Sequence, residues 1–288
     1  MAESPQVRGL YHAPTSTFSY VAWDPDSRQA IIVDPVLDYD SAAARTDTAS
    51  AAALMAIVVA ESLQVAWILE THAHADHLSA AHVLHRLTGA PVGIGRGISS
   101  VQRAFVDIYN LGADFPVDGR QFDHLFDAGE RIMVGNMPLE ILGTPGHTSD
   151  SITYRFGDAA FVGDTLFAPD YGTARCDFPG GDAATLFRSV QRLYGLPPET
   201  RLFLCHDYPP AGRGPRCEWS VDEQRQGNVH ITTNTTEDEF VLMRKAKDKT
   251  LGMPALILPA VQVNIRAGRL PEPEADGSRY LRIPLDTL

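Results

Sequence analysis

Four side chains that can bind a metal ion lie within six residues of the chain. Residues 71–77 read Thr-His-Ala-His-Ala-Asp-His, which places three imidazoles and one carboxylate close together, at His72, His74, Asp76 and His77. Neutral imidazoles and a carboxylate suit a borderline divalent metal such as zinc, iron, copper or nickel. A single histidine is often an ordinary surface or hydrogen-bonded residue, but four such residues at this density predict a metal centre.

Three further polar residues follow strand-like apolar runs later in the chain. His147 stands in Gly-His-Thr, Asp164 stands in Gly-Asp-Thr, and His206 follows the apolar run at 201–205. A preceding glycine allows the tight turn and close backbone approach that such loops need. Loops at strand ends, held on a rigid sheet, are where sites are usually built. Either histidine alone would be unremarkable, but together with the histidine cluster they predict one site.

The elements that position these residues follow from the apolar pattern. A buried strand at 65–69 delivers the cluster, and helical spacing begins at 78–87. Other strands are expected at 18–23, 29–33, 92–94, 131–134, 139–142, 152–156, 159–162 and 201–205, and other helices at 48–64, 99–109, 182–194, 218–226 and 236–249. Hairpins alternate with helices in each half, which predicts an α/β domain with sheets packed face to face and helices outside.

Composition limits the class of protein. A chain of 288 residues with 44% hydrophobic content can build one large core, and no linker divides it, so we expect a single domain over 1–288 with a C-terminal extension from about 211. The net charge of -12 argues against a nucleic-acid partner. Three cysteines without a CxxC pair, no apolar signal region and no membrane-length apolar run predict a cytoplasmic protein without disulfides that does not bind a membrane.

The ordered motifs resemble those of the metallo-β-lactamase superfamily. The resemblance covers roughly residues 10–210 and rests on His-x-His-x-Asp-His, Gly-His-Thr, Gly-Asp-Thr and a late histidine. It implies an αβ/βα four-layer sandwich with the metal site between the sheet edges. In the binuclear zinc members, which cleave esters, thioesters or amides, one metal would be held by His72, His74 and His147 and the other by Asp76, His77 and His206, with Asp164 bridging.

A second segment resembles the persulfide dioxygenase branch of this superfamily. Residues 167–181 read Phe-Ala-Pro-Asp-Tyr-Gly-Thr-Ala-Arg-Cys-Asp-Phe-Pro-Gly-Gly, and His-Asp-Tyr follows at 206–208. The resemblance implies one Fe(II) per chain on His72, His147 and Asp164, an arrangement with open positions that suits oxygen chemistry. The implied reaction converts glutathione persulfide, O2 and water to glutathione and sulfite. The residues His74, Asp76, His77 and His206 would then surround the iron and orient its ligands.

The sequence also offers residues that could contact the substrate. Arg175 matches the arginine of that branch and is expected to position the site or an anionic substrate with Asp177 as charge partner, although a surface ion pair is an equal alternative. Tyr208 would hydrogen-bond a ligand or bound oxygen, or simply pack. Residues 38–64 and 211–249 differ from the shorter dioxygenases, so the thiol carrier need not be glutathione. The resemblance also implies a homodimer. No rhodanese-like domain follows in the sequence, so any sulfurtransferase partner would be a separate chain.

Two enzymatic interpretations therefore remain from the sequence. The first is a mononuclear iron persulfide dioxygenase, and the second is a thioester hydrolase of the glyoxalase II kind with two Zn(II) per chain. Both use the same side chains, so spacing does not separate them, and residues 167–181 favour the first. A non-catalytic metal or sulfur-carrier protein fits poorly because none of the seven ligand-capable residues is missing. A nucleic-acid-cleaving relative is disfavoured by the negative charge.

Overall fold

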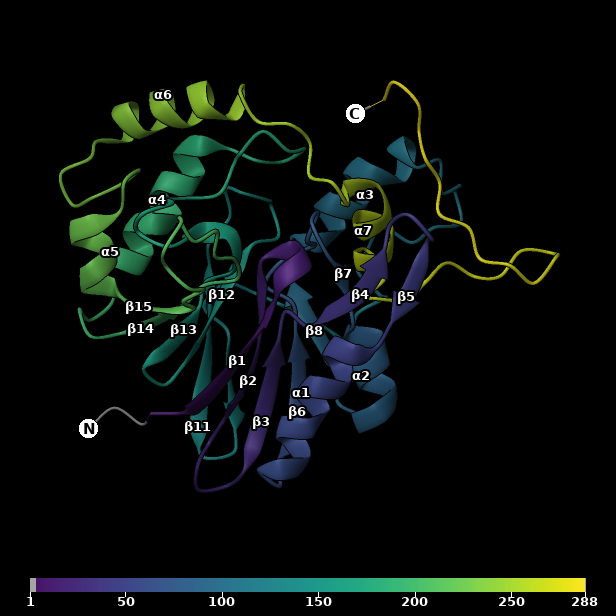
Figure 1. Ribbon diagram of the computed structural model, residues 1–288, viewed down its shortest axis with the longest axis horizontal. Coiled ribbons are helices and arrows are strands. Elements are labelled where there is room, and N and C mark those ends of the chain that lie inside the picture. The colour runs from purple at the N-terminus through teal and green to yellow at the C-terminus, as the bar shows by residue number, and fades with distance from the viewer. Residues whose placement is uncertain (1–3, 288) are drawn as a thin grey trace.

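Two six-stranded sheets form the centre of the computed structural model, which describes residues 4–287 (Figure 1). The first sheet has the order β1 (Gln6–His12), β2 (Thr17–Trp23), β3 (Gln29–Val33), β6 (Gln64–Leu69), β8 (Val92–Gly95) and β9 (His124–Phe126). The second has the order β10 (Arg131–Val134), β11 (Met137–Gly143), β12 (Ile152–Phe156), β13 (Ala159–Phe161), β14 (Arg201–Phe203) and β15 (Glu218–Ser220). A small sheet joins β5 (Arg45–Asp47), β4 (Val36–Asp40) and β7 (Leu78–Ser79).

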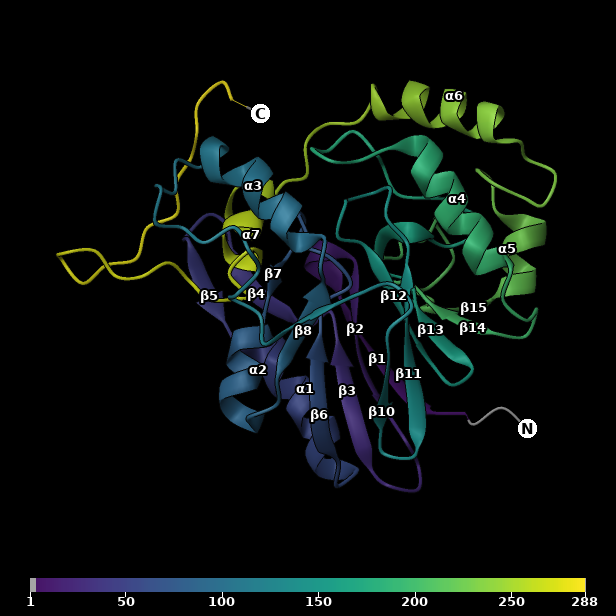
Figure 2. The ribbon, with the colours of Figure 1, turned by 180° about the vertical axis from the view of Figure 1, so that it is seen from behind.

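Helices cover the outer faces of both sheets (Figures 1 and 2). The first sheet is covered by α1 (Ala49–Ala60), α2 (Ala81–Thr88), α3 (Ile98–Ile108) and α7 (Ile257–Asn264). The second is covered by α4 (Ala183–Tyr194), α5 (Val221–Gly227) and α6 (Glu237–Asp248). A cluster of buried apolar side chains, which includes Tyr20, Phe161 and Phe203, fills the space between the two sheets. This arrangement confirms the predicted αβ/βα sandwich.

Strand direction explains why the site residues converge. In the first sheet β3, β6 and β8 are parallel, and in the second β13 and β14 are parallel while β11 runs antiparallel to β12. The carboxyl ends of β6, β11, β13 and β14 therefore open toward one edge of the sandwich. The loops that carry the histidine cluster, His147, Asp164 and His206 all begin at these ends.

Three of the expected helices differ from the structure by more than one residue at an end. Residues 78 and 79 pair with β4 as β7, so the helix expected at 78–87 begins instead at Ala81. Residues 218–220 pair with β14 as β15, so the helix expected at 218–226 begins at Val221. The helix expected at 48–64 ends at Ala60, and Gln64 already belongs to β6. In the first two cases pairing with another strand outweighs the local helical pattern.

Several elements were not expected from the sequence, namely β1, β4, β5, β9 and α7. By contrast, the predicted hairpins and the start of α6 are confirmed. The side chain of Thr236 accepts from the backbone of Glu239, and the Glu239 carboxylate accepts from Thr236 in return. All three cysteines are free thiols. Within residues 4–287 no helix is both long enough and apolar enough to cross a bilayer.

Candidate metal centre

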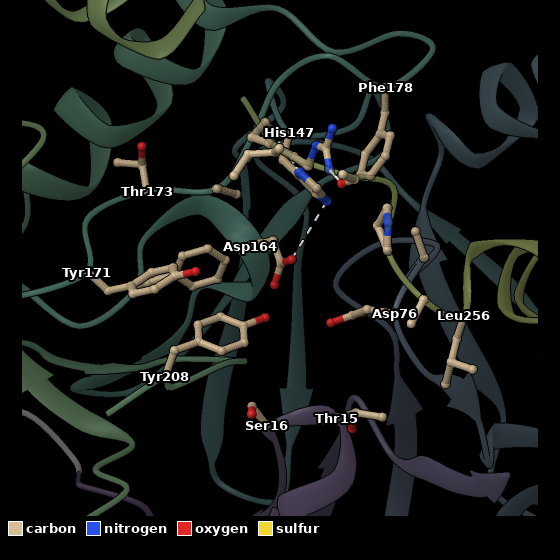
Figure 3. Close-up of a pocket in the computed structure, with 18 of the residues that line it drawn as sticks. Thr15, Ser16, Asp76, His147, Asp164, Tyr171, Thr173, Phe178, Tyr208 and Leu256 are labelled. Atoms are coloured by element: carbon tan, nitrogen blue, oxygen red, sulfur yellow. Dashed lines mark hydrogen bonds and ion pairs between the residues drawn. The ribbon is translucent and has the colours of Figure 1, made fainter. Parts of the chain in front are cut away.

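The predicted iron ligands lie together at the edge where the sheets meet. His72, His147 and Asp164 are buried, and each offers one atom within 4.8 Å of the others. The Nε2 atoms of His72 and His147 lie 3.9 Å and 3.7 Å from Asp164 Oδ2. Figure 3 shows the imidazole of His147 and the carboxylate of Asp164 converging above the pocket. Two imidazoles and one carboxylate can therefore face one cation.

The other four candidates form a second group beside the first. His74, Asp76, His77 and His206 each place one atom within 4.8 Å of the others. The Nε2 of His206 lies 3.1 Å from Asp76 Oδ2 and 3.3 Å from Asp164 Oδ1. Asp164 therefore touches both groups, and the tertiary structure brings together all seven residues that the sequence singled out.

Unpaired buried atoms show that the residues fit a metal. Among the described residues, His72 Nε2, His206 Nε2, Asp164 Oδ1 and both ring nitrogens of His77 are buried without a hydrogen-bond partner. A buried polar atom left unpaired costs about 1–3 kcal/mol. A divalent cation would satisfy several of these atoms at once, and imidazole and carboxylate donors suit it.

The opposite nitrogens of the candidate ligands are held by neighbouring groups. His72 Nδ1 lies 3.1 Å from Thr71 Oγ1, His147 Nδ1 lies 2.8 Å from the carbonyl of Arg175, and His206 Nδ1 lies 3.2 Å from Thr17 Oγ1. Such bonds orient a metal-binding imidazole and select its tautomer. In each of the three rings the Nε2 atom is consequently left to face the centre.

Glycine is required at two points where the ligand loops turn. Gly146 has φ +140°, and a Cβ there would lie 2.4 Å from the backbone of Leu186. Gly163 has φ +52°, and a Cβ there would lie 2.5 Å from the hydroxyl of Thr71. These contacts confirm the expectation that the glycines before His147 and Asp164 permit close approach.

Two acids behind the centre were missed by the sequence reasoning. Asp34, at the end of β3, accepts hydrogen bonds from the backbone and hydroxyl of Thr71 at 2.7 Å and 2.9 Å. It also lies 3.1 Å from His74 Nε2, and Glu70 lies 3.7 Å from the same atom. His74 is absent from the group of His72, His147 and Asp164, but it also forms a group within 4.8 Å with Asp164, Cys205 and His206. Neither of its ring nitrogens has a hydrogen-bond partner among the described residues. In the sequence Asp34 shows only as the polar residue that ends a strand.

A third missed residue comes from the C-terminal extension. Asn264, at the end of α7, donates to the carbonyls of His74 and His77, both at 2.8 Å, and accepts from the backbone N–H of Ser79 at 2.8 Å. It is 4% exposed. Three hydrogen bonds from one side chain thus fix the backbone on both sides of Asp76.

The charges of the centre are set by burial and by proximity. Burial holds the pKa values of His72 and His74 well below the usual histidine range, which keeps these rings neutral, as a metal ligand must be. For His206 burial acts in the same direction, but the carboxylates of Asp164 and Asp76 outweigh it and raise its pKa. Burial raises the pKa of Asp34 to about 6.

A cavity of about 440 Å³ opens over the centre. It is lined by Pro14, Thr15, Ser16, Ala75, Asp76, His147, Asp164, Phe167, Tyr171, Thr173, Ala174, Arg175, Phe178, Tyr208, Arg244, Lys247, Leu251, Gly252, Pro254, Ala255 and Leu256. The Tyr208 ring lies 4.7 Å from that of Tyr171, and its hydroxyl points toward Asp164 and Asp76 (Figure 3). The walls are mostly apolar and aromatic, with a few polar groups near the metal ligands, as small-molecule sites usually are.

Arg175 forms part of the cavity wall and is 12% exposed. Its Nε and Nη2 donate to the two carboxylate oxygens of Asp177 at 2.6 Å and 2.7 Å, and its Nη1 donates to the carbonyl of Gly252 at 2.6 Å. The guanidinium carbon lies 4.8 Å from the centre of the Phe178 ring. The residue therefore links the loop behind His147 to the segment after α6.

Helix α6 and the chain after it form another wall of the cavity. Arg244 is buried, donates to Asp248 and to the carbonyl of Thr173, and so has its charge balanced within the wall. Lys247, which the sequence reasoning did not single out, forms no ion pair with another described residue; its Nζ lies 2.7 Å from His230 Nε2. The region 211–249, which departs from the shorter dioxygenases, thus contributes directly to the cavity.

Comparison with known proteins identifies the family. The model of the metallo-beta-lactamase superfamily matches residues 12–206, which hold all seven candidate ligands. The chain belongs to the metallo-beta-lactamase superfamily.

Several relatives of this chain are named as hydrolases or as a glyoxylase. A "probable metallo-hydrolase" of Burkholderia pseudomallei is 50% identical over 98% of this chain and 99% of its own length. "Glyoxylase B2" of Dictyostelium discoideum is 43% identical over 100% of this chain and 99% of its own. A "beta-lactamase hydrolase-like protein" of Xylella fastidiosa is 49% identical over 99% of this chain, which spans 66% of that relative's length.

Other relatives are named for oxygen chemistry. "Persulfide dioxygenase ETHE1, mitochondrial" of Bos taurus is 30% identical over 91% of this chain and 88% of its own. The crystal structure of ETHE1 from Myxococcus xanthus, 30% identical, superimposes with a TM-score of 0.73 over 92% of this chain and 100% of that one. The superfamily, the fold and a metal-dependent enzyme are thereby established, and the names of the relatives include both a dioxygenase and hydrolases.

Proposed function

We propose that this protein is a mononuclear Fe(II) persulfide dioxygenase. The observation that carries the proposal is the composition of the first ligand group, which contains His72, His147 and Asp164 but not His74. Two histidines and one carboxylate with open positions are typical of non-haem iron oxygenases. A binuclear zinc site would need His74 in this group; its Nε2 lies 3.1 Å from Asp34 Oδ1, and it shares a group with Asp164 but not with His72 and His147. Similarity to a persulfide dioxygenase adds support.

The proposed reaction balances as one persulfide anion, one O2 and one water giving one thiol, one sulfite dianion and one proton. Iron bound by His72, His147 and Asp164 would supply the site at which persulfide sulfur and O2 react. The aromatic walls, including Phe167 and Tyr171, would limit the access of bulk water to that site once substrate is bound. The hydroxyl of Tyr208 would donate a hydrogen bond toward the reacting oxygens. Holding both reactants in place supplies much of the rate enhancement in such a reaction.

The substrate we propose is glutathione persulfide or another low-molecular-weight persulfide. A cavity of about 440 Å³ falls within the range of small-molecule sites. Arg175, paired with Asp177, positions the loop beside His147, while Lys247 offers a cation at the cavity wall to an anionic substrate. We further propose a cytoplasmic homodimer that receives persulfide from a separate sulfurtransferase.

The alternative is a binuclear zinc thioester hydrolase of the glyoxalase II kind. The second group of His74, Asp76, His77 and His206 favours it because these residues could hold a second ion, with Asp164 touching both groups. The similarity to "Glyoxylase B2" and to a probable metallo-hydrolase supports it as well. Both reactions release a proton at the centre.

Metal content and oxygen uptake together test the proposal. The protein is purified without added metal or chelator, and O2 uptake and sulfite release are measured with glutathione persulfide on the same sample. About one iron per chain with O2 uptake would support the dioxygenase. About two zinc ions per chain, no O2 uptake and cleavage of a glutathione thioester would replace it with the hydrolase. One metal with neither activity would overturn both.

A further inference from the structure

One arginine outside the metal centre joins the carboxylates of two loops. The Nη1 and Nη2 atoms of Arg213 donate to the two carboxylate oxygens of Asp207 at 2.6 Å and 2.8 Å. Its Nε and Nη2 donate to the two oxygens of Asp170 at 3.0 Å and 3.1 Å, and Nη1 also donates to the carbonyl of Gly214 at 3.2 Å. The N–H donors of a guanidinium lie in a fixed plane, and these contacts occupy all of them. Arg213 is therefore held in one orientation between two acids.

Each of these two acids directly precedes a tyrosine of the cavity wall. Asp207 is followed by Tyr208, and Asp170 is followed by Tyr171. The two rings lie 4.7 Å apart between their centres, and both line the cavity over the metal centre. The Tyr208 hydroxyl points toward Asp164 (Figure 3). Because Arg213 holds the two carboxylates together, it also fixes where the neighbouring tyrosines leave the backbone.

Burial makes the two halves of this bridge unequal. Asp207 is fully buried and also accepts from the backbone N–H of Arg216 at 2.7 Å, whereas the Asp170 side chain is 40% exposed. Leaving a buried carboxylate without its counter-charge is strongly unfavourable, so burial fixes Arg213 beside Asp207. The paired hydrogen bonds of the guanidinium then transmit that fixed position to Asp170, because bidentate arginine–carboxylate pairs are geometrically specific.

Arg213 lies in the region 211–249, which differs from the shorter dioxygenases. The other end of this region reaches the same wall, since Lys247 Nζ lies 5.8 Å from the centre of the Tyr171 ring. We propose that Arg213 is a positioning residue for the reaction, because it fixes the loop of Tyr171 against the loop of Tyr208 and so keeps the Tyr208 hydroxyl aimed at the metal centre. This inference rests on the proposed function, in which that hydroxyl donates toward the reacting oxygens.

Kinetics of two variants test the role of Arg213. Arg213→Lys keeps a positive charge beside Asp207, but an ammonium lacks the planar fork that spans both acids. Asp170→Ala leaves the buried pair intact and releases only the exposed half of the bridge. Because a small misplacement of a group at the reacting centre is costly, we expect kcat to fall about tenfold in Arg213→Lys and about threefold in Asp170→Ala, with metal content and KM unchanged. A wild-type kcat in either variant would overturn the proposal.

A double variant separates positioning from a general loss of stability. In the Tyr208→Phe background the hydroxyl is already absent, so adding Arg213→Lys should lower kcat by less than about twofold. The same loss in both backgrounds would contradict the proposal, since it would mean that Arg213 acts independently of that hydroxyl.

Arg201 provides a matched control. Its Nε and Nη2 donate to the two oxygens of Asp158 at 3.3 Å and 2.8 Å, and its side chain is 25% exposed, against 23% for Arg213. It does not line the cavity over the metal centre. Arg201→Lys should therefore leave kcat and KM at wild-type values. A loss of kcat equal to that of Arg213→Lys would show that breaking any such pair suffices, and the proposal would fail.

The contact between the two rings can be measured without turnover. In the metal-free full chain with ¹³C-labelled tyrosine, a nuclear Overhauser effect should link Tyr171 and Tyr208, whose ring centres lie 4.7 Å apart. Arg213→Lys should weaken this effect and shift both resonances, while Tyr109, which follows α3 and donates to the carbonyl of Ile257 at 3.0 Å, stays fixed. Unchanged resonances of both rings would refute the positioning role. If the wild-type enzyme shows neither reaction, the proposed function fails, and this measurement still decides whether Arg213 holds the two rings together.

Discussion

Replacing Asn264 should weaken metal binding, although Asn264 lies on α7 and this helix contributes no metal ligand. Asn264→Ala leaves the buried carbonyls of His74 and His77 and the N–H of Ser79 without their partner. Three hydrogen bonds at about 1 kcal/mol each predict a loss of about 3 kcal/mol in the free energy of unfolding. Because the loop that carries Asp76 is then less fixed, we expect the metal dissociation constant to rise about 10–100-fold, as for other groups that orient metal ligands.

Gln262 offers a control on the same helix. Its side chain also makes three hydrogen bonds, to the carbonyl of Leu258 and to both backbone groups of Arg282, at 2.7–2.9 Å. These bonds hold the C-terminal tail and not the ligand loop. Gln262→Ala should therefore cost about 1 kcal/mol of stability, since the tail backbone can turn to water, and leave the metal affinity unchanged.

Urea unfolding of the metal-free proteins and competitive titration with a chelator provide the two measurements. Asn264→Asp adds a stricter test, because it retains an acceptor for Ser79 but turns a carboxylate oxygen toward the carbonyls of His74 and His77. It should impair metal binding at least as much as Asn264→Ala. Equal metal affinities for wild type and both Asn264 variants, with stability lowered as expected, would refute the link between α7 and the metal.

Four further outcomes are expected. His147→Ala should remove metal and activity together; retained metal with normal turnover would exclude His147 from the site. Arg175→Ala should lower kcat/KM about tenfold, or 1.4 kcal/mol, and unchanged kinetics would make Arg175 only an ion-pair residue. Tyr208→Phe should lower kcat without changing the Tm. Asp182→Ala should cost about 1 kcal/mol of stability at pH 7 by removing a helix cap. Since hydrogen bonds from Thr185 hold the folded-state pKa of Asp182 below 3.8, that cost should shrink as the pH falls through the lowered value; a constant cost would contradict it.

The sequence was sufficient for the local part of the structure. Alternation and helical spacing depend on neighbouring residues, so the hairpins, α4 and the capped start of α6 were predictable. The predicted starts of the helices at 78 and 218 were wrong. Residues 78–79 and 218–220 pair with β4 and β14 as strands, so these helices begin at Ala81 and Val221. Neither partner strand adjoins these residues in the sequence, so the local helical pattern does not show the pairing.

The sequence by itself also singled out the side chains that lie together at the candidate metal centre, because residue type, density and position after apolar runs are local properties. Only the tertiary structure decided how they are used. Asp34 lies 37 residues from Thr71, Thr17 lies 189 from His206 and Asn264 lies 190 from His74. Contacts over such separations depend on how the strands pair and on which loops share one edge. The approach of His74 Nε2 to Asp34 at 3.1 Å is therefore a property of the folded chain alone.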